Sequence, residues 1–263
     1  MPDSPDYEFL AVRRDGPVLH LRLNRPDKLN SFAGSIRDDI RRVVEQADED
    51  PEVGCLVVSG EGRAFCAGGD VKVMERLRGD DDRAAFAAIL DSANAAALAL
   101  RRCRVPTIAL VHGAAAGAGA NLALGCDVRW GTPQASFTQS FIKLGLVPDW
   151  GGSRLLVETV GLDRARELIL TARTVRGDEA LRLGLLHRIV DDRDTLESEA
   201  ATLALELASR SALAITALDD LMLAARSEGS FDDQLELEKS WQLRCFDSPA
   251  ARAAFEAFFN RKG

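Results

Sequence analysis

Asp149 is the acidic side chain whose surroundings best suit it to acid–base chemistry. It lies in the stretch VPDWGG (147–152), where an indole follows it and apolar residues precede it. Partial desolvation would raise the pKa of this carboxyl group, and a raised pKa suits a general base. There is also a structural alternative. The glycine pair and the helical pattern that follow are equally typical of a helix N-cap.

Two turns made of small residues could supply backbone N–H groups to the same chemistry. The first is the run AAAGAG (114–119), between a buried strand predicted over Thr107–Val111 and a helix. The second is Gly68-Gly69, before a helix predicted to start near Asp70. Two N–H groups at helix starts that converge on one carbonyl oxygen form an oxyanion hole. Close backbone packing is the alternative for each turn, and both hypotheses stay open here.

Composition limits the class of protein. The chain has 263 residues, 46% of them hydrophobic, enough for one large domain or for one domain plus a subdomain. A net charge of −8 with both signs interspersed argues against a nucleic-acid partner, which needs a concentrated basic face. The five cysteines lack metal-ligand spacing and indicate a reducing compartment without disulfides. The histidines form no cluster, so we expect no metal site.

The apolar stretches predict a cytoplasmic protein. The N-terminal segment MPDSPDYEF is acidic and has no apolar core, unlike a signal peptide. No apolar run approaches about 20 residues, so we expect no membrane span.

Strands and helices alternate along the first part of the chain, as in an α/β fold. A strand is predicted at Val18–Leu23, which alternates, and another at Cys55–Ser59, which is wholly apolar like a buried parallel strand. Between them, apolar residues recur at helical spacing over 36–47. Further short strands are predicted at Cys126–Trp130 and Ala135–Thr138.

The last part of the chain is predicted to be helical. Its four final helices are expected over 194–210, 212–226, 231–246 and 250–259. An apolar stripe through Trp241, Phe255, Phe258 and Phe259 is longer than one small core requires, so we expect it to face a neighbouring segment or subunit. We therefore divide the chain into a core at 1–195 and a C-terminal helical segment at 196–263.

Five landmarks together resemble the enoyl-CoA hydratase/isomerase (crotonase) superfamily over nearly the whole chain. They are LNRPDKLNS, AFCAGGD, HGAAAGAGANLALGCD, FIKLGLVPDWGG and ARTVRGDEALRLGLLHRIV. The resemblance implies an α/β spiral of repeated ββα units with a C-terminal helical trimerisation segment, assembled as a homotrimer or hexamer. It also implies an acyl-CoA thioester substrate, with coenzyme A as part of that substrate and no separate cofactor.

The resemblance further implies site residues. The backbone N–H groups of Gly69 and Ala118 would form the oxyanion hole, and Asp149 would be the acid–base group. The positions expected to contact the substrate or its CoA moiety are Lys28, Leu29, Asn30, Ala67, Asp70, Val71, Asn121, Phe141 and Trp150. The C-terminal end, AFEAFFNRK, departs from the family's AFxEKR pattern, so no phosphate contact is assigned to a C-terminal lysine.

The acids favour an isomerase. Hydratases of the family carry two glutamates, at positions that match Asn121 and Phe141 here. Adding water to a double bond needs one group to activate water and another to protonate carbon, and an amide and a phenyl ring cannot share that task. A single base can move a proton between two carbons of an enolate. VPDWGGSRLL also resembles the IPDxGGTxxL of phenylacetate-pathway epoxyphenylacetyl-CoA isomerases.

Three alternatives remain open. One is an enoyl-CoA hydratase. Another is an acyl-CoA dehalogenase or hydrolase with a nucleophilic aspartate, although the supporting tryptophan of the dehalogenases would fall at Phe141. The third is a non-catalytic acyl-CoA-binding or RNA-binding paralogue. The net charge weakens the RNA version, and the presence of Asp149 with both glycine-rich turns weakens the inert version.

Overall fold

The chain divides into two units, Met1–Ala208 and Ser209–Gly263, in a computed structural model that describes residues 7–226 and 229–260. The first six residues and Lys262, which bear on the expectations for the N-terminus and the C-terminal lysine, lie outside the described residues. Helix α8 (Arg193–Ala208) belongs to the first unit.

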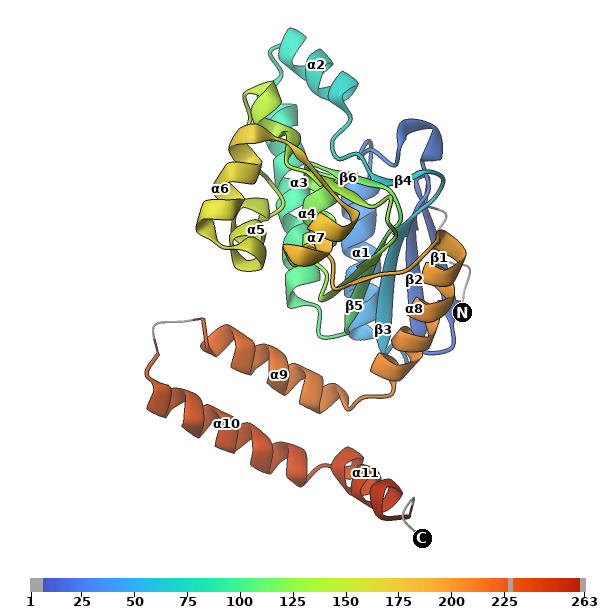
Figure 1. Cartoon of the computed structure of the whole chain (residues 1–263), viewed down its shortest axis with the longest axis vertical. Coiled ribbons are helices and arrows are strands. Elements are labelled where there is room, and N and C mark those ends of the chain that lie inside the picture. Colours follow the sequence, from blue (N-terminus) through green and yellow to red (C-terminus); the bar gives the residue numbers. More distant parts are fainter. Residues whose placement is uncertain (1–6, 227–228, 261–263) are drawn as a thin grey trace. The chain divides into compact units, whose positions relative to one another are not determined.

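Two sheets lie at the centre of the first unit (Figure 1). The larger contains, in spatial order, β1 (Leu10–Asp15), β2 (Val18–Leu23), β3 (Cys55–Gly60), β5 (Thr107–Val111), β7 (Val128–Gly131) and β10 (Arg188–Ile189). The smaller contains β4 (Ala64–Cys66), β6 (Ala114–Ala116), β8 (Ser136–Thr138) and β9 (Thr174–Arg176). The pairs β1–β2 and β8–β9 are antiparallel, and the other strand pairs are parallel.

A ββα unit recurs along the chain. Strands β3, β5 and β7 lie in the larger sheet, and the strand that follows each of them lies in the smaller sheet. Helices then follow each strand pair: α2 (Val71–Gly79) and α3 (Arg83–Arg102), then α4 (Ala118–Leu124), then α5 (Gly152–Val160) and α6 (Leu162–Thr171). This arrangement confirms the α/β spiral of ββα repeats that the resemblance implied.

The small-residue run at 114–119 differs from its prediction. The sequence predicts a strand that turns directly into a helix, but a second strand, β6, lies between β5 and α4. Alanine has a low intrinsic preference for strands. Pairing with β4 on one side and β8 on the other decides the conformation here, which the local sequence could not reveal.

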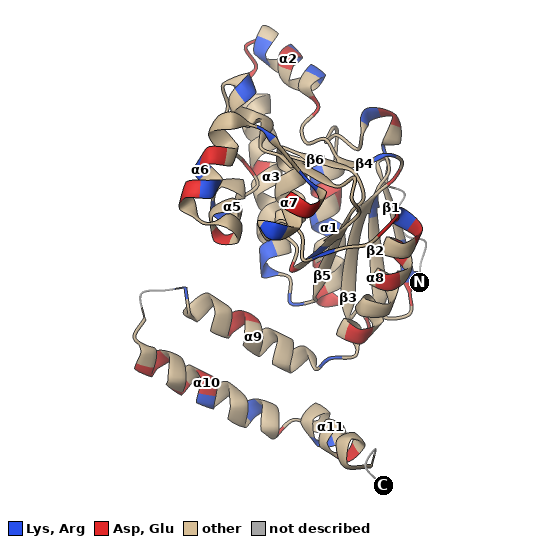
Figure 2. Ribbon diagram, viewed as in Figure 1, with Lys and Arg blue, Asp and Glu red and all other residues tan. Residues whose placement is uncertain are grey.

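Helices cover both faces of the larger sheet. On one face, Leu196 of α8 packs with Val57 and Ile108. On the other, Leu21 packs with Ile40 of α1 (Ile36–Glu49), and α3 lies beyond α1 (Figure 1). Successive strand residues point to opposite faces, which explains the apolar run at β3. Helices α6 and α8 contain both basic and acidic residues (Figure 2).

Helix α3 is long and apolar enough, by length and composition alone, to cross a membrane, with a mean hydropathy of 1.3. Asp91 interrupts its apolar sequence. Ala93, Ala96 and Leu100 are buried, and the helix packs on α1. Core helices of soluble proteins pass the same test, so this feature is weak evidence for a membrane span.

The second unit contains α9 (Ala212–Ala224), α10 (Phe231–Phe246) and α11 (Pro249–Asn260), close to the bounds predicted for these helices. Trp241 is buried, and the Arg244 guanidinium lies 3.8 Å from the centroid of its ring. The burial of Trp241 agrees with the expectation that this residue faces a neighbouring segment, and α10 packs against α9. Phe255, Phe258 and Phe259 of α11 are exposed in the single chain.

Candidate active site

Backbone hydrogen bonds join the loop around Lys28 to the glycine turn before α2. The amide of Ala67 donates to the carbonyl of Leu29 at 2.9 Å, and the amide of Asp70 donates to that of Phe32 at 3.2 Å. The two groups of positions expected to contact CoA are therefore neighbours, although they lie far apart in the sequence.

The conformation of the first loop is unusual. Leu29 and Asn30 have φ angles of 52° and 56°, in the left-handed region that non-glycine residues seldom adopt. The Asn30 amide donates to the carbonyls of Ala64 and Phe65 at 2.8 and 3.1 Å, and this residue has no exposed surface. These hydrogen bonds of the buried Asn30 side chain fix the conformation of the loop. Lys28, two residues earlier, is exposed.

Arg25 links the same two segments through its side chain. Its Nη1 forms an ion pair with the Asp70 carboxylate at 2.8 Å and donates to Ser31 Oγ at 3.0 Å. Asp70 also caps α2, because its carboxylate accepts from the Lys72 amide at 3.1 Å. The hydrogen bond from Arg25 is the main reason that the pKa of Asp70 lies below its ordinary value.

The two small-residue turns lie against each other. Gly68 has a φ of 86°, and a Cβ on it would lie 3.2 Å from the backbone nitrogen of Ala118. Ala118 is the first residue of α4, so its N–H has no partner within the helix. In the part of the chain that the structure describes, the N–H of Gly69 forms no backbone hydrogen bond either. The Phe141 ring packs against the second turn, 3.6 Å from where a Cβ on Gly117 would lie.

Asp149 has the desolvated carboxyl group that the sequence predicts. Burial raises its pKa to about 6, although the positive charge of Arg37 acts in the opposite direction. Its Oδ1 is buried without a hydrogen-bond partner among the described residues. The N-cap alternative is wrong, because α5 begins at Gly152 with Gly151 as the capping residue.

Asn121 holds the backbone at Asp149 in place. Its Nδ2 donates to the Asp149 carbonyl at 2.9 Å, and its Oδ1 accepts from Gln139 Nε2 at 2.8 Å. Gly152 packs directly on this amide, where a Cβ would collide with it. In this conformation the Asn121 side chain supports the Asp149 loop.

Arg37 is a site residue that the sequence did not reveal. It lies in the first turn of α1, is only 6% exposed, and its guanidinium is 5.5 Å from the centroid of the Phe32 ring. Phe32 in turn stacks on Trp150 with centroids 5.0 Å apart, so the indole is enclosed. Burial lowers the pKa of Arg37, and the nearby charge of Asp149 raises it. A cation in the first turn opposes the helix dipole, which is the one local signal that could have marked it.

A pocket of about 550 Å³ lies beside Gly69, between α2, α3 and the loop that precedes Asp149. Its lining contains both apolar and charged residues: Val71, Met74, Leu77, Phe86, Leu144 and Leu146, and Glu75, Arg78, Asp81, Asp82 and Arg83. The Met74 methyl group reaches Gly69, where a Cβ would collide with it. The apolar part of the lining suits a hydrocarbon or aromatic group.

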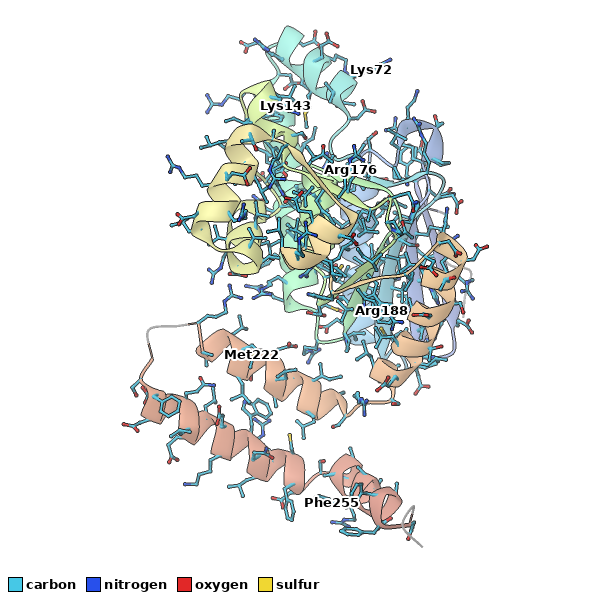
Figure 3. All side chains as sticks on the ribbon, in the orientation of Figure 1. Lys72, Lys143, Arg176, Arg188, Met222 and Phe255 are labelled. Carbon is cyan, nitrogen blue, oxygen red and sulfur yellow. The ribbon has the colours of Figure 1, made fainter. Side chains whose placement is uncertain are left out.

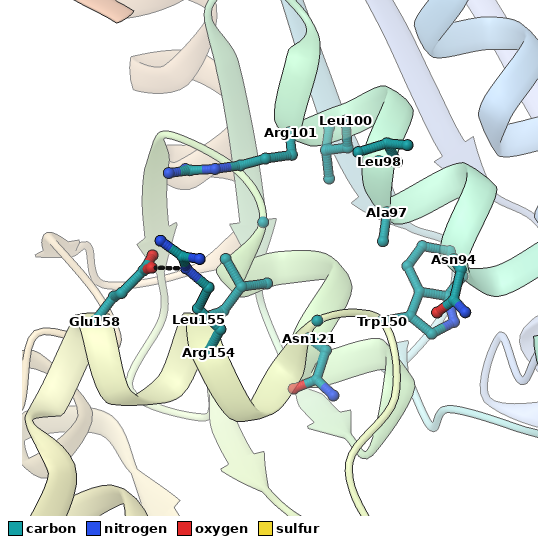
Figure 4. A pocket seen from close by; sticks show the side chains of 12 residues that line it. Asn94, Ala97, Leu98, Leu100, Arg101, Asn121, Trp150, Arg154, Leu155 and Glu158 are labelled. Carbon is teal, nitrogen blue, oxygen red and sulfur yellow. Dashed lines mark hydrogen bonds and ion pairs between the residues drawn. The ribbon is translucent and has the colours of Figure 1, made fainter. Parts of the chain in front are cut away.

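A second pocket, of about 250 Å³, lies behind the Asp149 loop (Figure 4). Asn121 and Trp150 form part of its wall, and α3 contributes Ala97. An ion pair of 2.6 Å between Arg154 and Glu158 lies at its edge. Neither pocket is lined by Asp149 itself, and the second one contacts the Asp149 loop through Asn121 and Trp150.

Three of the chain's five lysines lie on or near the loop at Lys28–Asn30, the turn before α2 or the Asp149 loop. Lys28 ends the short helix η1 (Pro26–Lys28), Lys72 is in α2, and Lys143 is in η2 (Ser140–Leu144). Figure 3 shows Lys72 and Lys143 at the end of the first unit where α2 lies. Over residues 7–226 and 229–260, no ion pair joins any of the three to an acid, so these cations are available to an anionic ligand.

The cysteines offer no catalytic group. None of the five forms a disulfide. Cys66, which is nearest to the site, is buried, donates to the Asn30 carbonyl at 3.1 Å, and has its pKa raised to about 12 by burial. Among the described residues, no group of three His, Cys, Asp or Glu side chains is arranged to hold a metal ion.

Comparison with known proteins gives consistent matches. The family described as enoyl-CoA hydratase/isomerase matches residues 13–263. A probable enoyl-CoA hydratase of Mycobacterium bovis is 37% identical over 227 residues, covering 85% of this chain and 86% of that protein. The 1,2-epoxyphenylacetyl-CoA isomerase of Escherichia coli is 32% identical and covers 97% of both chains. The crystal structure of a putative enoyl-CoA hydratase from Streptomyces coelicolor superposes with a TM-score of 0.89 at 34% identity, covering 100% of this chain and 94% of that one.

Proposed function

The chain belongs to the enoyl-CoA hydratase/isomerase family, and we propose that it is an acyl-CoA isomerase with Asp149 as its single acid–base side chain. The observation that carries this proposal is the half-buried Asp149 carboxyl group, with a pKa raised to about 6 and an enclosed Oδ1 that has no hydrogen-bond partner among the described residues. The positions at which the resemblance expects the glutamates of hydratases hold Asn121 and Phe141, which cannot transfer a proton. The similarity to an isomerase over 97% of the chain supports the same reaction.

In the proposed mechanism, the N–H groups of Gly69 and Ala118 hold the thioester oxygen. Removing a proton from the acyl chain builds negative charge on that oxygen, and each donor can stabilise the charge by about 3–4 kcal/mol. The Asp149 carboxylate accepts the proton from one carbon of the acyl group. The resulting carboxylic acid then returns it to another carbon of the dienolate, so the double bond moves and no atom is lost or gained.

The groups around the two small-residue turns suggest where the acyl chain and the CoA moiety of the substrate would bind. The apolar part of the pocket beside Gly69 would take the end of the acyl group. The loop at Lys28–Asn30 and the turn at Ala67–Val71 would hold the CoA moiety. The exposed lysines near these loops would pair with its phosphates.

The test is a screen of substrates with identification of the products. We expect the protein to convert 3-enoyl-CoA or 1,2-epoxyphenylacetyl-CoA to an isomer, and to hydrate 2-enoyl-CoA slowly. Asp149→Asn should lower kcat by roughly 10²–10⁴-fold with little change in substrate binding. Asn121→Ala is the control and should cost clearly less, because Asn121 supports the loop and carries no proton.

A hydratase is the second candidate, because the M. bovis relative at 37% identity is a probable enoyl-CoA hydratase. Hydration of crotonyl-CoA as fast as the shift of a 3-enoyl bond would favour that candidate. Full isomerase activity in Asp149→Asn would contradict the proposed mechanism.

A further inference from the structure

The Arg37 side chain is a buried cation without a hydrogen-bonding partner. The residue is 6% exposed, and its Nε is enclosed without a partner. Among the described residues, no hydrogen bond or ion pair within 4.0 Å satisfies this guanidinium. Burying an ionised group without hydrogen bonds is unfavourable, and its position in the first turn of α1 adds repulsion from the helix dipole. Folding alone therefore does not account for an arginine at this position.

The guanidinium lies beside the reacting groups. Its Nη2 is 4.0 Å from where a Cβ on Gly69 would lie, so it adjoins the turn that offers its N–H to the thioester oxygen. The charge of Asp149 acts on it, yet the two side chains form no ion pair within 4.0 Å. The ring of Phe32 covers part of it, with the guanidinium carbon 5.5 Å from the ring centroid. A base and a cation therefore stand near each other, each with an unsatisfied polar atom.

The free atoms of Arg37 define the kind of group that would satisfy it. Nε–H and one Nη2–H lie on the same edge of the planar guanidinium and point in parallel, so they can donate to an oxygen of a ligand. The positive charge of Arg37 already balances the negative charge of Asp149. A ligand carboxylate would place a second negative charge beside Asp149, whereas an uncharged oxygen accepts the hydrogen bonds without that repulsion.

We propose that Arg37 binds an uncharged oxygen atom on the acyl group of the substrate, such as a hydroxyl, carbonyl, ether or epoxide oxygen. The inference rests on the proposed function and adds a substrate class to it: acyl-CoA thioesters whose acyl group carries oxygen beyond the thioester carbonyl. An acyl group made only of carbon and hydrogen leaves the Arg37 donors unsatisfied when it fills the site and excludes water.

The experiment measures binding of matched acyl-CoA pairs by calorimetry. Methoxyacetyl-CoA and butanoyl-CoA differ only in an oxygen that replaces a methylene group, and 4-oxopentanoyl-CoA and 4-methylpentanoyl-CoA differ in a carbonyl oxygen that replaces a methyl group. In at least one pair, the wild-type protein should bind the oxygenated member about tenfold or more tightly, the usual effect of a hydrogen bond to a charged group. Succinyl-CoA is included as a carboxylate.

Three variants assign the preference to a residue. Arg37→Met should abolish the preference, and Arg37→Lys, which keeps the charge but loses the planar edge, should reduce it. Arg41→Met makes the same change on the same helix, at an ion pair with Glu45, and should leave it intact. Circular dichroism of each variant checks that the fold is retained.

Each contrary result has a distinct meaning. Equal binding within both pairs by the wild-type protein overturns the inference but leaves the proposed function standing. So does tightest binding of succinyl-CoA, or a preference that persists in Arg37→Met. If Arg37→Met shifts the pH profile of turnover but leaves the affinity ratio unchanged, the residue acts on Asp149 alone and the inference is wrong. No binding of any acyl-CoA overturns both this inference and the proposed function.

Discussion

The Asp149 carboxyl group should make activity depend on pH near neutrality. Its pKa is raised to about 6 because it is buried, so the carboxylate form needed for proton abstraction prevails above that pH and is lost below it. We expect kcat/KM for isomerisation to be level above pH 7 and to fall about tenfold per pH unit below about 6. Initial rates between pH 4.5 and 8.5, with unfolding monitored at each pH, measure this profile. A profile that stays level down to pH 4.5 would contradict the role of Asp149.

Gly69 should act through its backbone N–H rather than through the space left by its missing side chain. Gly69→Pro removes the N–H, so kcat should fall by at least about 10²-fold, the effect of losing one oxyanion donor. Gly69→Ala keeps the N–H, and its Cβ meets the flexible end of Met74, which can move aside. We therefore expect the alanine variant to retain most of the activity that the proline variant loses. Equal loss in both variants would indicate a steric role for this glycine.

The individual side chains differ in how far sequence could reveal them. The raised pKa of Asp149 could be predicted from the apolar residues beside it in the sequence. Arg37 could not be recognised, because its surroundings come from Phe32, Gly69 and Asp149, which only the fold brings together. Asn121 was expected to contact the substrate, but its hydrogen bonds to the Asp149 carbonyl and Gln139 depend on the tertiary structure.

Among the elements, those with a strong apolar pattern were predictable. Strands β2 and β5 have the bounds expected from their apolar residues. The short strands β4 and β6 were missed. Each spans three residues, and the parallel pairing between them, rather than the propensity of their residues, decides their conformation.

The Arg25–Asp70 ion pair should control how well the two loops proposed to bind CoA, at Lys28–Asn30 and Ala67–Val71, are held together. Both side chains are largely enclosed, and the pair joins the segment before η1 to the N-cap of α2. Arg25→Met should raise the dissociation constant for acyl-CoA about tenfold and lower kcat less, because Asp149 and Ala118 lie outside these loops. Arg13→Met, which breaks an exposed pair with Asp15, is the control and should change neither. An unchanged dissociation constant in Arg25→Met would show that the loops hold their shape without the pair.

For the whole molecule, exposed aromatic rings predict assembly. Phe255, Phe258 and Phe259 lie on α11 and are more than half exposed in the single chain, although phenylalanine is usually buried. We expect a homotrimer or a hexamer, measured by sedimentation equilibrium at micromolar concentration. The double variant Phe255→Ser/Phe259→Ser should dissociate. Leu205→Ser, on α8 of the first unit, is the control and should stay assembled. A monomeric wild-type protein would refute this prediction.

The unpartnered Oδ1 of Asp149 predicts how much deuterium label the product retains. A proton taken by this oxygen has no hydrogen-bond partner, among the described residues, to which it could pass directly. The carboxyl group is also partly buried, which slows exchange with water. Deuterium placed on the carbon that loses its proton should therefore reappear, in large part, on the carbon that gains one, even in ordinary water. Mass spectrometry of the product measures the retained label, and complete loss of deuterium would show that the proton reaches solvent during each turnover.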